Sequence, residues 1–219
     1  MQIEHAAPLP DRRLRVRVRQ WMDLLSAAVM AGATVATAYS AYQSSLWNGE
    51  QAIHHARYTT AVIRTAKLTN LAMQRTGVHV NLFVHWLTAV NRGDKQTADS
   101  LFTRFPEPLK AAAEAWRTSS PTEKPDAPAS PFDMPQYALQ EGSDADRWEQ
   151  IAQDESAAAE KAGETANRYL LFTIIYASVL FLAGISGKFK WPAIDVTVLV
   201  LGAVTLLTGV AIMIASPRL

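Results

Sequence analysis

The sequence contains no cysteine. Disulfide frameworks, thiolate zinc sites and iron–sulfur clusters are therefore excluded. Also absent are the G-x-S-x-G turn of serine hydrolases, a phosphate-binding glycine loop and the H-E-x-x-H pattern of zinc proteases. We accordingly expect no enzyme activity and no cofactor, and the sequence identifies no small-molecule substrate.

Histidine supplies the few candidate metal ligands in the middle of the chain, at His54, His55, His79 and His85. Glu50 and His54 share a helix face, but His79 and His85 are six residues apart and would lie on different faces. The sequence thus favours solvated or interface histidines over a metal site.

Charged residues are nearly absent from three stretches, residues 24–42, 169–187 and 193–216, although the whole chain carries 21 Lys+Arg and 20 Asp+Glu. The second and third stretches, of about 19 and 24 residues, would extend roughly 28 Å and 36 Å as helices. A bilayer core of about 30 Å needs that length. We predict three transmembrane helices, at 21–42, 169–187 and 192–216.

The first of these stretches is rich in alanine, serine and threonine and follows a basic segment. A basic start, an apolar run and small residues also describe a secretory signal peptide, so this alternative stays open. A transmembrane helix is favoured because the apolar run exceeds the roughly 7–15 residues of a signal-peptide core.

Positive charges flank the spans unevenly. They are Arg12, Arg13, Arg15, Arg17 and Arg19 before the first span and Lys188 and Lys190 in the short loop between the second and third. Three spans place both groups on one side of the membrane, and the positive-inside rule makes that side cytoplasmic. The arginines suit orientation and contact with anionic headgroups, so no nucleic-acid partner is expected.

These charges predict a multi-pass protein of the bacterial inner membrane. The predicted segments are a cytoplasmic N-terminus (1–20), a cytoplasmic loop (188–191), an extracytoplasmic domain (43–168) and an extracytoplasmic C-terminus (217–219).

The domain at 43–168 begins with a long helix. Residues 43–91 contain no proline and place apolar or small residues on an alternating spacing of four and three, typical of helical bundles and coiled coils. This seam comprises Ala52, Ala56, Ile63, Ala66, Met73, Val80, Val84 and Leu87, with Thr59, Asn70 and Gly77 as its weak points.

Local signals mark the helix boundaries that follow. Gly93 should end the long helix and Asp94 should cap the next one, over 95–117, with a bend at 105–108. Five prolines make 119–137 an extended strap. We expect part of it to lie against the bundle through Phe132, Met134 and Tyr137.

The last helix of the domain should begin near Ser143, where Asp146 completes a variant of the capping box, and should run directly into the second span. Its segment 141–168 carries eight acids, whereas 43–92 is basic. We predict that the two segments pair antiparallel, with Arg57 near 161–168 and Arg75 near 144–155.

The sequence therefore predicts an all-α fold, with three transmembrane helices and an extramembrane antiparallel helical bundle or stalk. A long stalk and a compact bundle both fit the helix lengths, since a bend at Asn48, Gly49 or Gly77 would shorten the domain.

The first span carries two lines of small residues. One line holds Ser26, Ala33, Thr37 and Ser40, and the line beside it holds Ala27, Ala31, Thr34 and Ala38. Small and hydroxyl-bearing faces let membrane helices approach closely. They can equally line a wet pore in an oligomer, and helix packing is the favoured interpretation.

Four segments carry a resemblance: AYQSSLWNGEQA at 41–52, RFPEPLK at 104–110 with Ala115 and Trp116, SPFDMPQY at 130–137, and ASVLFLAGIS at 177–186. Together they resemble a family of uncharacterised bacterial inner-membrane proteins with three spans and an extracytoplasmic helical domain. The resemblance implies bacterial origin and membrane location and brings no functional residue with it.

We therefore expect a non-enzymatic integral membrane protein that acts through assembly in the lipid bilayer, with itself or as a small subunit of a larger membrane complex. The alternatives are an oligomeric channel lined by the first span and a sensor that needs a partner for its output.

Overall fold

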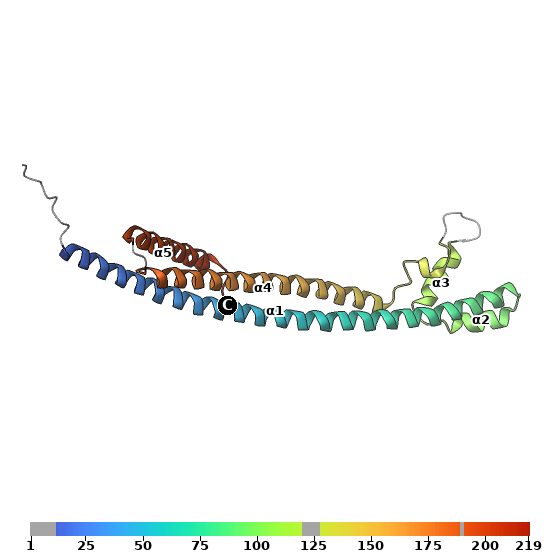
Figure 1. The fold of residues 1–219 in the computed structure, drawn as a ribbon. Coiled ribbons are helices and arrows are strands. Elements are labelled where there is room, and N and C mark those ends of the chain that lie inside the picture. Colours follow the sequence, from blue (N-terminus) through green and yellow to red (C-terminus); the bar gives the residue numbers. More distant parts are fainter. Residues whose placement is uncertain (1–11, 120–127, 189–190) are drawn as a thin grey trace, which may run out of the picture. The chain divides into compact units, whose positions relative to one another are not determined.

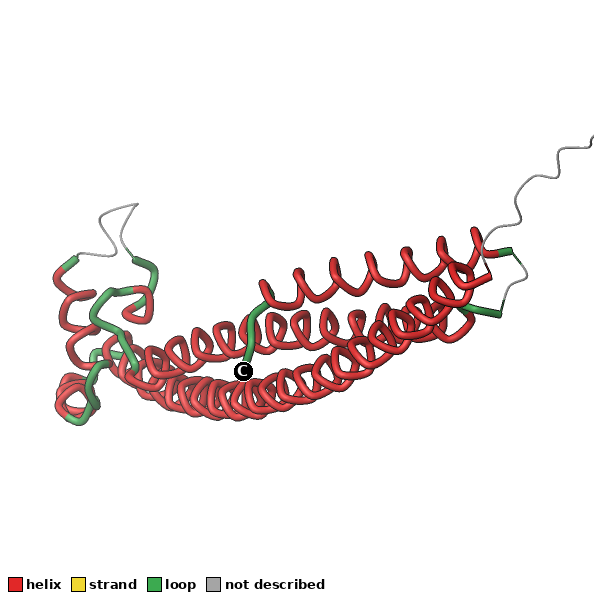
Figure 2. The backbone as a smooth tube through the Cα atoms, turned by 90° about the vertical axis from the view of Figure 1, so that its left-hand side faces the viewer, coloured by secondary structure: helices red, strands yellow, loops and turns green. Residues whose placement is uncertain are grey.

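Every regular element in the described chain is helical (Figure 1). The structure, a computed structural model, describes residues 12–119, 128–188 and 191–219. The elements are α1 (Arg12–Asn91), α2 (Lys95–Thr103), α3 (Leu109–Thr118), the 3₁₀ turn η1 (Pro131–Asp133), α4 (Gln140–Ile185) and α5 (Pro192–Ala215). Figure 2 shows the same succession of helices and loops, with no strand in the described parts. The all-α prediction is confirmed there.

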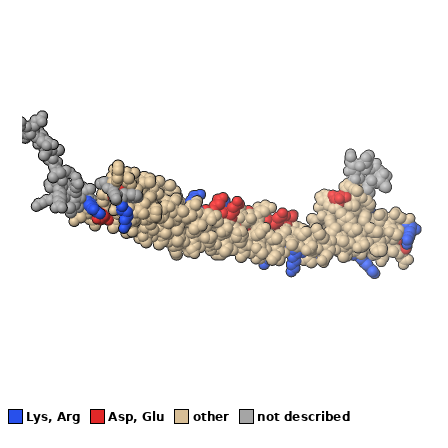
Figure 3. Space-filling model, viewed as in Figure 1, with Lys and Arg blue, Asp and Glu red and all other residues tan. Residues whose placement is uncertain are grey.

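Three of these helices, α1, α4 and α5, contain segments long and apolar enough to cross a membrane. They overlap the spans predicted at 21–42, 169–187 and 192–216, although α4 ends at Ile185 and α5 at Ala215. Three such helices are expected for a multi-pass membrane protein. Figure 3 shows an almost charge-free surface over α5, while acidic side chains follow the part of α4 that precedes its span.

The chain divides into two compact units. Unit 1 comprises Met1–Ile53 and Ala158–Leu219, and unit 2 comprises His54–Ala157. The two long helices, α1 and α4, contribute residues to both units.

Small residues of α1 meet large residues of α4 and α5 in the core of unit 1. One cluster of buried residues comprises Val29, Ala33, Val179, Ala183 and Leu199, and a second comprises Ala36, Tyr169, Phe172, Tyr176 and Met213. The aromatic rings are accommodated because small residues face them. Gly209 is one of these, since a Cβ there would lie 2.9 Å from a ring carbon of Tyr176.

The connection from α4 to α5 is closed by a side chain of α5. Gly187 has a φ of 84°, and its backbone N–H donates to Asp195 Oδ1 at 3.0 Å. The helix begins at Pro192, and Asp195 lies in its first turn. A carboxylate there also complements the positive end of the helix dipole.

An aromatic cluster forms the core of unit 2. Its buried members are Phe83, Trp86, Ala89, Ala98, Phe105, Leu109 and Ala113, which come from α1, α2, α3 and the α2–α3 connection. Phe132 and Tyr137 of the strap pack against it, so part of the strap lies against the helices as predicted. The strap is not extended throughout, because Pro131–Asp133 forms the turn η1, in which the Ser130 hydroxyl donates to the Asp133 carboxylate at 2.8 Å. Residues 120–127 of the strap lie outside the described residues.

The predicted boundary signals near residue 93 are confirmed. The long helix ends at Asn91, Gly93 has a φ of 74°, and Asp94 caps α2 by accepting from the Thr97 N–H at 3.0 Å. The expected bend at 105–108 is a break between α2 and α3. Proline explains the break, because it lacks the N–H that a continuous helix needs.

The start of α4 differs from the prediction. The helix begins at Gln140, so Ser143 lies inside its first turn and donates to the Gln140 carbonyl at 2.9 Å instead of capping the helix. The helix continues into the second span without interruption, as expected. Helix α1 continues without interruption through Gly49 and Gly77.

Within unit 2, basic residues of α1 meet α4 in reverse order along the two helices. Arg75 pairs with Glu141 at 2.7 Å, and the guanidinium of Arg64 lies 4.3 Å from the Trp148 ring centroid. Glu155 accepts from His54 at 2.5 Å and lies 3.9 Å from Arg57. The predicted charge pairing is present in the antiparallel sense.

Its predicted register is wrong. Arg57 reaches Glu155 and not 161–168, and Arg75 reaches Glu141 instead of 144–155. Exposed ion pairs each contribute under about 1 kcal/mol, so packing sets the register and the charges follow it.

The buried face of α1 in unit 2 is not the face that carries the seam. Ala61, His79, Phe83 and Trp86 are buried there, whereas the seam positions are exposed, except for half-buried Leu87. Met73, one of the larger side chains of the seam, is 65% exposed.

His79 is an interior polar residue of this unit. Its Nδ1 is joined to the Tyr137 hydroxyl at 2.9 Å, and the two rings meet edge to face with centroids 5.8 Å apart. Burial, and then the positive charge of Arg75, lowers the pKa of His79 below its usual value. The neutral imidazole therefore ties the strap to α1 at neutral pH.

Candidate functional site

The two lines of small residues in the first span have different surroundings in unit 1. The first line faces the other helices: the Ser26 hydroxyl donates to the Ala183 carbonyl at 2.8 Å, and Ala33 is fully buried. Ser40 is fully buried too and donates to Met213 Sδ at 3.3 Å, while Thr37 bonds to the Ala33 carbonyl of its own helix at 2.7 Å.

The second line lies on the outer surface of α1. Ala27, Ala31, Thr34 and Ala38 are all exposed, and the Thr34 hydroxyl bonds to the Met30 carbonyl of its own helix at 2.8 Å. This face is therefore open to lipid or to another helix.

The residues predicted to orient the chain are described only in part. Arg19 and Lys188 are exposed. Arg12, Arg13, Arg15 and Arg17 lie in the first turns of α1, where only the backbone is described, and Lys190 lies outside the described residues.

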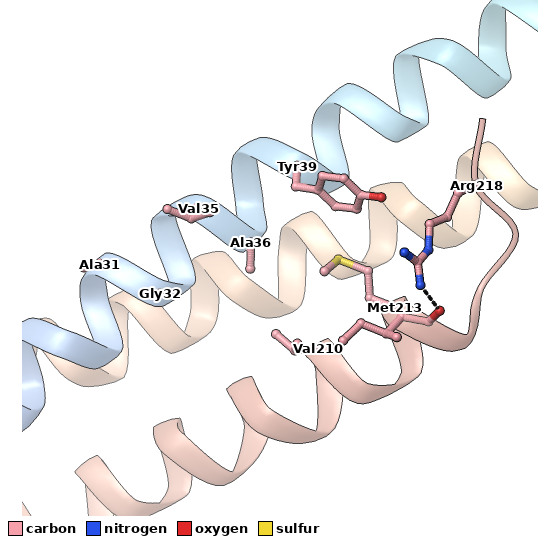
Figure 4. Close-up of a pocket in the computed structure, with 9 residues that line it drawn as sticks. Ala31, Gly32, Val35, Ala36, Tyr39, Val210, Met213 and Arg218 are labelled. Atoms are coloured by element: carbon pink, nitrogen blue, oxygen red, sulfur yellow. Dashed lines mark hydrogen bonds between the residues drawn. The ribbon is translucent and has the colours of Figure 1, made fainter.

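A groove of about 650 Å³ lies between α1 and α5. It is lined by Ala31, Gly32, Val35, Ala36, Tyr39, Val210, Met213, Ile214 and Arg218. Figure 4 shows its arrangement: apolar side chains of both helices form the walls, and Tyr39 and Arg218 stand together near one end.

The chain segment after α5 is fixed at that end of the groove. The Tyr169 hydroxyl donates to the Pro217 carbonyl at 2.8 Å. The side-chain amide of buried Gln43 donates to the main-chain oxygen of Leu219 and accepts from its N–H, both at 3.3 Å. Arg218 is thus held by its neighbours on both sides.

The sequence reasoning did not find this end of the groove. Gln43 and Leu219 are 176 residues apart, so their contact has no local signal. The sequence indicates this end of the groove only through residue type, because tyrosine and arginine at the end of a span are typical of the membrane interface.

The described residues contain no group of three His, Asp or Glu side chains that could hold a metal ion. Comparison with known proteins adds nothing to this description, because no family model, no curated protein and no solved structure matches the chain.

Proposed function

We propose that this chain is a non-enzymatic integral membrane protein that acts through assembly, with a second copy of itself as the partner. A role as a small subunit of a larger membrane complex is the alternative within the same class. The lack of a catalytic sequence motif supports the non-enzymatic part. The assembly part rests on one observation, the exposed seam of α1 in unit 2.

This seam runs from residue 56 to residue 87 with a strict alternation of three and four. Its positions are Ala56, Thr59, Ile63, Ala66, Asn70, Met73, Gly77, Val80, Val84 and Leu87. Exposed apolar residues scattered singly are common on protein surfaces, but a seven-residue period is the pattern by which one helix packs along another. Within unit 2, α4 packs on a different face of α1. The seam positions are therefore left exposed, except Leu87, which packs against the aromatic cluster.

The polar and small members of the seam also fit a helix partner. Asn70 occupies the position where a single asparagine fixes register and oligomeric state in coiled coils, at some loss of stability. Met73, Gly77 and Val80 contribute to a groove of about 680 Å³, whose other lining residues include Ala145 of α4. A second helix laid on the seam would cover this groove.

The residues beside the seam favour a second copy of the same chain. These flanking positions hold Thr60, Val62, Lys67, Thr69, Gln74, Thr76, Asn81 and Phe83. Lys67 is the only charge among them, and in a parallel pair it would face Val62 of the second copy. In such a pair, no flanking position therefore places two like charges opposite each other. Copies that cross one membrane in the same orientation present α1 in the same direction, which gives the parallel arrangement.

Single-cysteine variants of the full chain test this assembly without background, since the protein has no cysteine of its own. Met73→Cys is expected to form a disulfide-linked dimer in membranes under mild oxidation. Val78→Cys is the matched control, because Val78 is 58% exposed on the same helix but off the seam. Met73→Glu should lower the dimer fraction about tenfold or more by opposing two carboxylates, and Val78→Glu should not.

Equal crosslinking at positions 73 and 78 would contradict a defined seam. Crosslinks from position 73 to a different protein, and never to a second copy, would instead favour the subunit of a larger complex.

A pore lined by the first span is not proposed. Ser26 and Ser40, the hydroxyl-bearing residues at either end of the candidate lining, bond to α4 and α5 of the same chain. Water between copies would have to meet a different face of α1.

We further propose that the protein resides in a bacterial inner membrane and belongs to the uncharacterised family that its sequence resembles. Its N-terminus and the 188–191 loop would be cytoplasmic and 43–168 extracytoplasmic. The distribution of lysine and arginine supports this orientation. Reporter fusions should be active as cytoplasmic enzymes at residues 5 and 189 and as exported enzymes at residue 125. An exported reporter at residue 5 would reverse the orientation.

A further inference from the structure

The groove between α1 and α5 has two kinds of surface. Its walls are the apolar side chains of residues 31–36 on α1 and 210–214 on α5. Val35 is 70% exposed within this surface, so the groove opens toward the surrounding bilayer. Its one charged lining residue is Arg218, which stands beside Tyr39 at one end (Figure 4).

The length of the groove matches one leaflet. From Ala31 to Tyr39 the helix rises about 12 Å, and half of a hydrocarbon core of about 30 Å is close to that depth. Tyr39 and Arg218 therefore lie where the first span reaches the interface, at the depth of lipid phosphates. A single acyl chain would follow the groove from there toward the middle of the membrane.

Arg218 keeps most of its hydrogen-bonding capacity for a ligand. Its guanidinium donates to the Ile214 carbonyl at 2.5 Å, and no carboxylate among the described residues pairs with it. A guanidinium has five N–H donors in a fork that fits phosphate oxygens.

Tyr39 offers a second donor at the same place. Its hydroxyl accepts from the Gln43 amide at 3.3 Å, and no acceptor for its own O–H occurs among the described residues. Gln43 also bonds to the main chain of Leu219, the residue next to Arg218. One buried side chain therefore contacts both the Tyr39 hydroxyl and the chain segment that carries Arg218.

We propose that this groove is a binding site for one anionic phospholipid, with an acyl chain between α1 and α5 and the phosphate on Arg218 and Tyr39. The site goes beyond the proposed assembly function and does not depend on it, because it lies within a single chain. Apolar walls alone would accept any lipid, and the cation at the interface selects the anionic headgroup.

The test uses the delipidated full chain in detergent, with bound lipid counted by native mass spectrometry. Dioleoyl phosphatidylglycerol should bind at one molecule per chain, while dioleoyl phosphatidylcholine and glycerol 3-phosphate should bind about tenfold more weakly or not at all. Arg218→Gln should lose about tenfold in affinity for phosphatidylglycerol, and Arg218→Lys should retain part of it. Arg168→Gln removes an exposed charge just before the second span and should change nothing.

A second pair of variants tests the walls. Val35→Phe fills the groove and should abolish the one-to-one phosphatidylglycerol complex. Leu207→Phe, at an equally exposed position of α5 outside the groove, should not.

The proposal is overturned by equal binding of the two lipids, by equal effects of Arg218→Gln and Arg168→Gln, or by retention of the lipid in Val35→Phe. It is also overturned if Val35→Phe changes the oligomeric state without changing bound lipid, since the groove would then seat another helix.

Discussion

Replacing Trp86 by alanine is expected to lower the free energy of unfolding of unit 2 by about 3–5 kcal/mol, the range for removing a buried aromatic side chain. Trp86 is 6% exposed. Its ring lies 5.5 Å from Phe83, 5.8 Å from Phe102 and 6.2 Å from Phe105, measured between centroids. The loss is large because this ring joins α1 to α2 and to the turn before α3.

Hydrogen exchange of the full chain in detergent measures this effect region by region. The Trp86→Ala variant should lose protection across α2, α3 and the end of α1. Val78→Ala, an exposed position eight residues earlier on the same helix, should change stability by less than about 0.5 kcal/mol. Unchanged protection of α2 and α3 in the Trp86 variant would contradict the cluster as the core of this unit.

Ala33→Leu is expected to destabilise unit 1 by about 1–3 kcal/mol or more, because it overfills a close contact between helices. Ala33 is fully buried and packs in one cluster with Val179 and Ala183 of α4 and Leu199 of α5. Added carbons would force α1 away from α4 and weaken the hydrogen bond from Ser26 to Ala183. Thermal unfolding in detergent should show a lower midpoint for this variant.

Ala38→Leu is the matched change on the outer line of small residues. Ala38 is exposed, so the midpoint measured on dispersed single chains should stay near that of the unchanged protein. If the outer line packs between copies, this variant will instead reduce the oligomer fraction in membranes. Equal midpoints for Ala33→Leu and the unchanged protein would contradict the close packing of the inner line.

The sequence was most informative where the controlling interactions are local. Three apolar stretches indicated the candidate spans, because length and hydrophobicity alone decide whether a helix fits a bilayer. Gly93 and Asp94 marked a helix end and a helix start, since both act through their own backbone and the next three residues.

Local patterns misled where several signals compete. Ser143 looked like a cap, but α4 starts three residues earlier, at Gln140. The seam of α1 has ideal helical spacing, yet α4 packs on another face, where Ala61 is buried and Arg64 lies over the Trp148 ring. A heptad spacing indicates that a helix face can pack, but it does not indicate which element packs against that face.

Only the tertiary structure decided the register of α1 and α4 and the composition of the groove. The ion pair between Arg75 and Glu141 could have formed at several registers, because surface charges contribute little and tolerate sliding. The groove brings Tyr39 and Arg218 together from opposite ends of the chain. Such contacts depend on the volumes of all the side chains between the helices, which act together in the packed core and leave no local signal in the sequence.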